Sequence, residues 1–482
     1  MNLRNIFTVI FISASLSTSA QQKKAIERLK VSAQEDINSL KDTYEDIAMR
    51  IWNFAEVGYK EERSAALLQQ ILRDNGFRVE GGVAGIPTAF VATYGSGKPV
   101  IGILAEYDAL PGLSQQAIPE KKPAEGLTAG HGCGHHLFGT ASVAAVIAMK
   151  NLMSEGKIKG TIRLYGCPAE EGGSGKVYMV RAGLFEGLDA VIHWHPGSRN
   201  EVTLTSALAN KSAKFRFYGK AAHAASAPEQ GRSALDAVES MNYMTNLMRE
   251  HIPQEARMHY IITRGGTAPN VVPDFAEVYY YVRHPDKEVV KELFERVEAA
   301  ANGAALGTGT TMDYEIIGGT HDLLINYELA RAAQGNLTRV GGVVYSQEEI
   351  EFGKKIQGTL SGDIPDLTSA SKIISFDEER TGGIGSTDVG DVSYAVPTVG
   401  IRTATWIPGT PAHSWQAVAC GGTSVGIKGM MVAAKTMALT AIDLYTDPAL
   451  IQRAKDEFTK AVGNYQYEAL LGGRSPALNY RD

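Results

Sequence analysis

The stretch HGCGHH at residues 131–136 follows a strand-like segment and a loop and precedes a long apolar segment. It places three histidines and one cysteine among glycines. Thiolate sulfur and neutral imidazole are preferred ligands of zinc-like ions, and glycine lets the backbone bend so that side chains converge. Cys133 and His135 are spaced to face one side. Taken alone, the stretch would also fit a histidine-rich surface turn, but its surroundings indicate a metal site.

The segments around this stretch predict an α/β fold with a mostly parallel sheet. Residues 100–104 (VIGIL) form a continuous apolar run, as in a strand buried on both faces. A helix is predicted over residues 137–153, and strands are predicted over 161–165 and 190–194. Strand, helix and strand in this order favour a parallel sheet with helices on its faces. Towards the N-terminus, amphipathic helices are predicted over residues 33–59 and 61–75.

The pattern changes near Ser212. The following segments are predicted, in order, as a strand, a helix, two strands, a helix and a strand: residues 213–218, 233–249, 257–263, 276–283, 287–301 and 311–317. This is the β-α-β-β-α-β order of a ferredoxin-like unit. We expect it to be inserted into a larger domain, which gives a catalytic domain over 21–210 and 320–482 and an insertion over 211–319. A long helix near 424–444 closes the fold.

Bulk properties agree with a soluble enzyme of two domains. The chain has 482 residues, 44% of them hydrophobic and 21% charged, and this length exceeds one ordinary core. A net charge of −6 gives no support for a nucleic-acid surface. The three cysteines, Cys133, Cys167 and Cys420, cannot form a disulfide framework.

Residues 1–20 have the pattern of a secretory signal peptide. Arg4 supplies positive charge, residues 6–16 form a short apolar core, and residues 18–20 form a small-residue cleavage site before Gln21. The apolar run is short for a bilayer span, although an uncleaved anchor is the alternative. We expect a secreted or periplasmic protein, and we expect no later segment to span a membrane.

Further metal-binding residue types follow other predicted strands. The strand at 161–165 is followed by CPAEEGG, which places Glu170 and Glu171 side by side, and the strand at 190–194 is followed by His195. Adjacent carboxylates repel each other unless a cation holds them. The carboxyl ends of parallel strands form the usual active-site edge of such a sheet. His413 lies far downstream in a turn rich in proline and glycine.

In this order, the motifs HGCGHH, PAEEGG, WHP and PAHSW resemble the aminoacylase/hippurate-hydrolase branch of the di-metal metallopeptidase family. The resemblance covers nearly the whole chain after the signal. It implies a zinc-peptidase-like catalytic domain, a ferredoxin-like lid that dimerises, and hydrolysis of the amide bond of N-acyl amino acids. Within this branch, three features resemble the members that act on p-aminobenzoyl-glutamate: Trp194 before His195, STDVGDVSYAVPT at 386–398 and GTPAHSWQ at 409–416. This resemblance implies p-aminobenzoyl-glutamate as substrate and a role in folate catabolism.

The family pattern implies ligands for two divalent metal ions, manganese or zinc, with the cysteine bridging both ions: Cys133, His135, Glu171, His195 and His413. It also implies that Glu170 is the general base. The chemistry agrees with this division, because a water between two cations has its pKa lowered to about 7. A neighbouring carboxylate can then take its proton and return it to the leaving amine.

The resemblance also assigns roles to the insertion. His223 matches the family histidine that the lid offers to the partner subunit's active site, where it would stabilise the oxyanion. Asn270 and Arg283 match positions that approach the substrate carboxylate. A guanidinium binds a carboxylate through two hydrogen bonds, but Arg283 would equally fit a strand-end salt bridge. We expect a homodimer through the lid, or a heteromer with a related subunit.

The chain departs from the branch directly after His135. The branch commonly has Asp at the next position, where this chain has His136, and the two residues after it replace a further histidine. The surroundings of the metals are therefore expected to differ. Glu106 and Asp108 follow the strand at 100–104 and are candidates for orienting a ligating histidine.

Three other functions compete with this one. GTSVG at 422–426 satisfies the G-x-S-x-G pattern of serine hydrolases, but no histidine follows His413 and Ser424 is expected near the N-cap of the last long helix. A dipeptidase or aminopeptidase of the same wider family is the second alternative, and amides with free or blocked amines would separate it. The third is an inactive homologue that binds ligands, which would hold metal without turnover.

Overall fold

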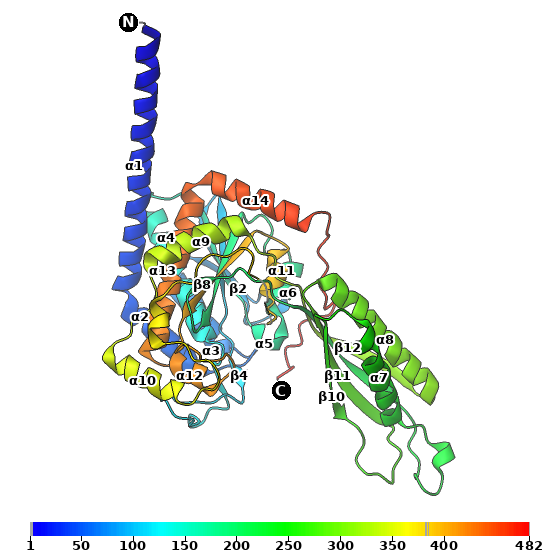
Figure 1. Cartoon of the computed structure of the whole chain (residues 1–482). Helices are drawn as coiled ribbons and strands as arrows, with labels where there is room; N and C mark the ends of the chain where they lie inside the picture. The colour runs from blue at the N-terminus through cyan, green and yellow to red at the C-terminus, as the bar shows by residue number, and fades with distance from the viewer. Residues whose placement is uncertain (1–2, 381–382, 384, 482) are drawn as a thin grey trace.

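Two larger β-sheets organise the chain, and each has its own hydrophobic core (Figure 1). The computed structural model describes residues 3–380, 383 and 385–481, and for residues 3–20 it describes the backbone only. The first sheet has the order β1-β2-β6-β3-β7-β13-β8. Its strands are β1 (Arg78–Gly81), β2 (Phe90–Ser96), β3 (Val100–Ala105), β6 (Gly160–Gly166), β7 (Ala190–Gly197), β8 (Glu201–Val202) and β13 (Thr398–Ala404).

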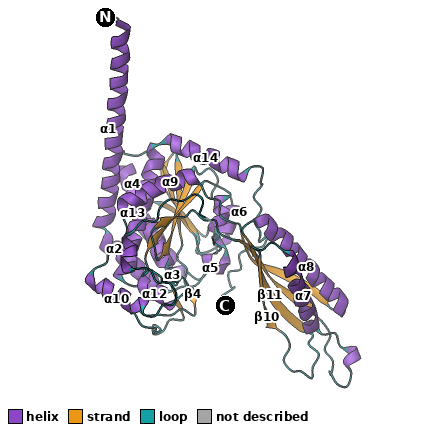
Figure 2. Ribbon diagram, in the orientation of Figure 1, coloured by secondary structure: helices purple, strands orange, loops and turns teal. Residues whose placement is uncertain are grey.

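The centre of this sheet is parallel, as the sequence predicts. Strands β6, β3, β7 and β13 run in one direction, and β1, β2 and β8 extend the edges in antiparallel pairings. Figure 2 shows the strands at the centre of the domain with helices around them. The carboxyl ends of the parallel strands meet at one edge, which is where such folds place their sites.

Helices α4 (His135–Ser154) and α13 (Ser424–Thr446) pack against this sheet and against each other. Both are long and apolar enough to cross a membrane, but 78% of the most apolar window of α4 and 89% of that of α13 are buried inside the protein. Leu137, Phe138 and Leu439 are among their completely buried side chains. Burial of this kind explains their uniform apolarity.

The N-terminal helices differ from the prediction at one point. The predicted helix over 33–59 is wrong as a single element, because α1 (Leu3–Ser39) and α2 (Lys41–Phe54) are separated at Leu40, whose ψ of 15° leaves the helical range. Each helix buries its own apolar face: α1 packs on α13 and α4, and α2 packs on α4 and α3 (Glu62–Asp74). The helical periodicity of the sequence continues through Leu40, so the break between α1 and α2 comes from the way in which the two helices pack on their neighbours.

The remaining elements of the larger domain are short or peripheral. They are β4 (Leu110–Pro111), β5 (Ala129–Gly130), α5 (Glu170–Gly173), α6 (Gly175–Arg181), α9 (Tyr327–Val340), α10 (Gln347–Gln357), α11 (Val389–Ser393), α12 (Trp415–Gly421) and α14 (Pro448–Val462). After α14 the chain runs back between the two sheets (Figure 1).

The second sheet belongs to the ferredoxin-like insertion, whose predicted element order is confirmed. The elements are β9 (Ala209–Tyr218), α7 (Ala234–Met248), β10 (Arg257–Arg264), β11 (Phe275–His284), α8 (Lys287–Thr308) and β12 (Thr311–Thr320). The sheet is antiparallel with the order β10-β11-β9-β12. Figure 1 shows this lid extending away from the larger domain. The predicted boundaries at residues 211 and 319 fall inside β9 and β12.

Candidate metal centre

Cys133 and His135 lie at the start of α4, where the glycine between them turns the chain. Gly134 has a φ of 74°, in the left-handed range that favours glycine. The Cys133 Sγ atom lies 3.5 Å from Nε2 of His195 and 3.4 Å from Nε2 of His413. Segments that are far apart in the sequence therefore meet at this thiol.

All five predicted ligands come together in two groups. In each group the ligand atoms lie within 4.8 Å of one another, and the groups are Cys133 with His135 and His195, and Cys133 with Glu171 and His413. Cys133 belongs to both groups, as the predicted bridging role requires. A third group, within the same limit, joins Glu170 to His135 and Glu106. The predicted base thus lies beside the predicted ligands.

Asp108 connects two of the ligand-bearing segments. Its Oδ1 atom lies 2.8 Å from Nδ1 of His135, and its Oδ2 atom accepts a hydrogen bond of 2.9 Å from the backbone N–H of Glu171. This contact engages Nδ1 of His135 and leaves Nε2 as the nitrogen available to the predicted metal, with Oε2 of Glu106 at 3.1 Å from it. The two carboxylates that follow β3 therefore orient the histidine.

The loop that carries Glu170 and Glu171 has an unusual backbone. Ala169 and Ser174 flank it with φ values of 55° and 59°, and non-glycine residues in this region store strain that surrounding contacts must hold. The C-terminal tail supplies such contacts: Tyr480 donates a hydrogen bond of 3.0 Å to the Glu171 carbonyl, and Arg481 donates to the same oxygen. No sequence signal pointed to this role of the tail.

Negative charge dominates the centre. Burial, together with the carboxylates of Glu106, Glu171 and Asp388, raises the pKa of Glu170 well above its ordinary value. Although burial opposes a charged imidazole, Asp108 and Glu106 outweigh it and raise the pKa of His135. The negative charge therefore favours the protonated forms of Glu170 and His135.

The residues present fit a pair of divalent cations. Three buried atoms make no hydrogen bond among the described residues: Oε2 of Glu106, Nε2 of His135 and Oε1 of Glu171. They take part in ion pairs instead, at 3.1 Å between Glu106 and His135 and at 3.3 Å between Glu171 and Nε2 of His413. Buried polar atoms without hydrogen bonds are costly, and these three belong to the groups that converge on Cys133 or His135. Thiolate, imidazole and carboxylate together form a donor set suited to zinc and also compatible with manganese.

One buried lysine balances part of this charge. Lys176 is completely buried, and its Nζ atom lies 2.6 Å from Oε1 of Glu106 and 2.7 Å from Oδ1 of Asp388. Asp388 comes from the stretch at 386–398. A buried ion pair is stable only when its geometry is good. The contact with Lys176 therefore holds the Glu106 carboxylate in position. No pattern in the sequence pointed to Lys176, because a single lysine carries no local sign that it will be buried.

A cavity of about 870 Å³ opens in front of the centre and is lined by Cys133, Glu170, Glu171, His195 and His413, among others. Arg283 of β11 also lines it, and its Nε atom is buried without a hydrogen-bond partner among the described residues. The ion pairs of the described residues do not include Arg283. The strand-end salt bridge is therefore absent in this part of the chain.

His223 and Asn270 lie elsewhere. Both are exposed in loops of the lid and are not among the described residues that line the cavity. Their loops are adjacent, because Ala224 donates a backbone hydrogen bond of 3.0 Å to the Asn270 carbonyl. Within one chain the structure does not bring these two residues to the centre, which leaves their assigned roles as predictions.

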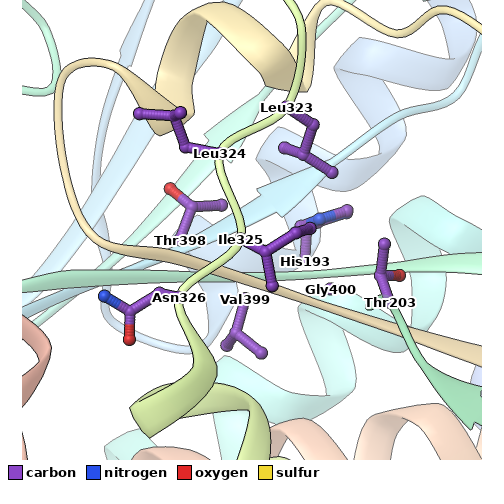
Figure 3. Close-up of a pocket in the computed structure, with 9 residues that line it drawn as sticks. All are labelled: His193, Thr203, Leu323, Leu324, Ile325, Asn326, Thr398, Val399 and Gly400. Carbon is purple, nitrogen blue, oxygen red and sulfur yellow. The ribbon is translucent and has the colours of Figure 1, made fainter. Parts of the chain in front are cut away.

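A second and much smaller cavity adjoins the first, since His193, Thr203 and Leu323 line both. Figure 3 shows His193, Thr203 and Gly400 around it, together with residues 323–326 and 398–399. Its volume is about 10 Å³, which suits one water molecule rather than a ligand. Burial lowers the pKa of His193 to about 3, so that this imidazole is neutral.

Other residues of the motifs have structural roles. Nε2 of His136 lies 3.0 Å from the Gly421 carbonyl and Nε2 of His131 lies 3.1 Å from the Ile51 carbonyl. Ser424 is the first residue of α13 and donates to Glu349 at 2.6 Å. A serine nucleophile at this position would need a histidine partner, and its contact is a carboxylate instead.

We predict that Asp108→Asn weakens metal binding about tenfold to a hundredfold, the usual cost of losing a partner that orients a metal ligand. The amide would keep the size of the side chain, but it has one oxygen instead of two. It could therefore not accept hydrogen bonds from both His135 and the Glu171 N–H in the same arrangement. The measurement is a competition titration with a metal chelator. Asp313→Asn, at an exposed position on β12, is the control, and equal affinities of the two variants would contradict the assigned role.

Comparison with known proteins places these features in context. Residues 209–308 match the peptidase dimerisation domain of the M20 family. The chain is 41% identical over 461 residues to a subunit of p-aminobenzoyl-glutamate hydrolase from Escherichia coli (strain K12), covering 89% of this chain and 95% of that protein. It is 31% identical over 452 residues to Xaa-Arg dipeptidase of Mus musculus, covering 90% and 93%.

A solved structure with the same fold is a dinuclear metal-binding peptidase of the M20 family from Bacillus subtilis. The two structures superpose with a TM-score of 0.57 over 85% of this chain and 99% of that one, at 17% sequence identity. The likeness confirms the arrangement of a parallel sheet with an inserted lid.

Proposed function

The chain belongs to the M20 peptidase family and is a metal-dependent amide hydrolase, and from this premise we propose that it cleaves p-aminobenzoyl-glutamate into p-aminobenzoate and glutamate. The observation that carries the proposal is the convergence of two ligand groups on Cys133 with Glu170 beside them. The chain is 41% identical to one subunit of a hydrolase that is named for this substrate, and this similarity supports the choice of acyl group and amino acid.

The chain's own residues supply the proton transfers. When bound, paired divalent ions lower the pKa of a water molecule and polarise the substrate carbonyl. Glu170 takes a proton from the attacking water and later gives it to the nitrogen of the leaving amine. The carboxyl must both accept and release the proton, and its place in one group with His135 and Glu106 sets it beside the predicted ligands. Arg283 binds the α-carboxylate of the amino acid through its guanidinium.

We propose that the lid joins two subunits, as a homodimer or with a related subunit. Its exposed apolar side chains include Ile261, Ile262 and Val271, with 62%, 44% and 46% of their surface accessible. Such a patch on an edge strand and the loop after it favours pairing with another chain. In the assembled pair, His223 and Asn270 of one subunit would reach the centre of the other.

We propose that residues 1–20 direct the chain to the periplasm or to secretion. Ala33 and Ile37, which α1 buries in the core, lie after the predicted cleavage site and would stay in place. N-terminal sequencing of protein recovered outside the cytoplasm tests this: a mature chain that begins at Gln21 supports it, and one that begins at Met1 contradicts it.

The function is tested by amine release from p-aminobenzoyl-glutamate, hippurate and an unblocked dipeptide. The purified protein is loaded with manganese or with zinc, and the rates identify the working metal. We expect the fastest release from p-aminobenzoyl-glutamate. Faster cleavage of the dipeptide would instead support a dipeptidase, and full metal loading with no turnover on any amide would support a binding protein.

We predict that His223→Ala lowers kcat by about a hundredfold or more while KM changes little, because an oxyanion donor acts in the transition state. Mixing this variant with Glu170→Gln should restore part of the activity, since a mixed dimer contains one intact site. Parallel assays with His251→Ala, in another loop of the lid, provide the control. An unchanged kcat would remove the role of His223.

A further inference from the structure

One wall of the cavity carries a concentration of positive charge that the metal centre does not use. Glu201 of β8 accepts a hydrogen bond of 2.9 Å from Arg199 and one of 2.7 Å from Arg380, and it lies 3.6 Å from Nη1 of Arg402. All four residues line the cavity. Three guanidinium groups thus share a single carboxylate, which leaves an excess of two positive charges.

Arg402 is the least satisfied of the three arginines. Within the described part of the chain its side chain makes no hydrogen bond, and its one ion pair is the contact with Glu201. The side chain is 42% exposed, although it lies within the cavity wall. A Cβ atom at Gly197 would come within 2.7 Å of its Cγ and Cδ atoms, so glycine leaves room for the arginine. Arg402 therefore offers free donors to an occupant of the cavity.

The sheet register places Arg402 beside the metal centre. Arg402 of β13 pairs with the predicted ligand His195 of β7 on one side and with Glu201 of β8 on the other. Neighbouring strands lie about 4.8 Å apart, so the backbone of Arg402 lies one strand from that of His195. The side chains of Arg402, His195 and Cys133 line the same cavity. A substrate whose amide lies at the centre can therefore extend towards Arg402.

We propose that Arg402, with Arg199 and Arg380 held in place by Glu201, binds a second carboxylate of the substrate, the one on the side chain of the leaving amino acid. This rests on the proposed amide hydrolysis and adds a selection rule to it. The enzyme prefers acyl derivatives of acidic amino acids, because the carboxylate neutralises guanidinium charge that is otherwise unpaired. Derivatives of arginine are disfavoured by the same charge.

The test compares p-aminobenzoyl-glutamate with p-aminobenzoyl-glutamine, which differ only in the side-chain carboxylate. We expect the wild-type protein to favour glutamate by about tenfold to a hundredfold in kcat/KM, the usual range for a charged hydrogen bond. In Arg402→Gln the preference should fall to within about threefold, through slower cleavage of the glutamate substrate alone. Arg402→Lys should keep part of the preference, because it retains the charge without the paired donors.

Two controls separate the subsite from general damage. Arg453→Gln, an exposed position on α14, should keep the wild-type preference, and Arg283→Gln should slow both substrates and leave their ratio unchanged. The proposal is overturned if Arg402→Gln keeps the preference, or if it slows both substrates equally at an unchanged melting temperature.

Binding of the free amino acids provides a readout that does not need turnover. Calorimetric titration of the full chain with L-glutamate and L-glutamine should show tighter binding of glutamate, and Arg402→Gln should remove the difference. Equal binding of both to the wild-type protein overturns the subsite. If no amide is cleaved but glutamate still binds selectively, the proposed hydrolysis fails and the subsite stands.

Discussion

Glu170→Gln is expected to lower kcat by about a hundredfold to ten-thousandfold, the range that a positioned general base contributes. The amide has nearly the same shape but cannot take a proton from water. In the structure Glu170 lies with His135 and Glu106 in one potential ligand group, so its carboxylate is close to any ion held there. The measurement is amine release from p-aminobenzoyl-glutamate at saturating substrate.

Metal content decides how this loss is interpreted. We expect elemental analysis of Glu170→Gln to find as much metal as in the wild-type protein, because the predicted ligands are unchanged. Glu239→Gln, at an exposed position on α7 of the lid, provides the matched control and should keep wild-type activity. Wild-type turnover in Glu170→Gln would show that the base is another group. Loss of metal together with turnover would show that Glu170 is a ligand instead.

Cys133→Ser is expected to reduce bound metal from about two ions per chain to fewer than about one. The reason is its place in both ligand groups: a hydroxyl is not ionised near neutral pH, whereas a thiolate can serve two cations at once. Turnover should fall with the metal. Elemental analysis of folded protein is the measurement, and full occupancy in the variant would mean that the thiol does not bridge.

The same thiol should make metal uptake dependent on pH. Burial and the nearby Glu171 carboxylate raise the pKa of Cys133, so the thiol is protonated before a metal binds. Binding must then release a proton, and affinity should increase as pH rises. Cys420→Ser removes another buried thiol, outside the ligand groups, and should retain both the metal and its pH dependence.

Much of the fold could be predicted because its elements are locally encoded. The apolar run at 100–104, the helix after residue 136 and the β-α-β-β-α-β order of the insertion all appear in the structure. Their bounds lie within a few residues of the predicted ones, except that α8 extends seven residues past its predicted end at residue 301. The periodicity of apolar residues and the apolar runs show which face of a helix or strand is buried in the core, and each segment contains this information in its own sequence. The break at Leu40 escaped prediction because it depends on how α1 and α2 pack on other helices.

The sequence by itself determined the chemistry: a cysteine, three histidines and a glutamate of types that bind metals, in motifs whose order resembles one family. The sequence also predicted Glu106 and Asp108 as residues that orient a ligating histidine, and the structure places Asp108 on His135. Only the tertiary structure decided the other groups that surround the ligands, which are Lys176 beside Glu106, the C-terminal tail on Glu171, and the arginines around Glu201. The reason is that motifs are contiguous, whereas the partners of each ligand come from distant segments. Ordinary charged residues have no local signature until folding brings them together.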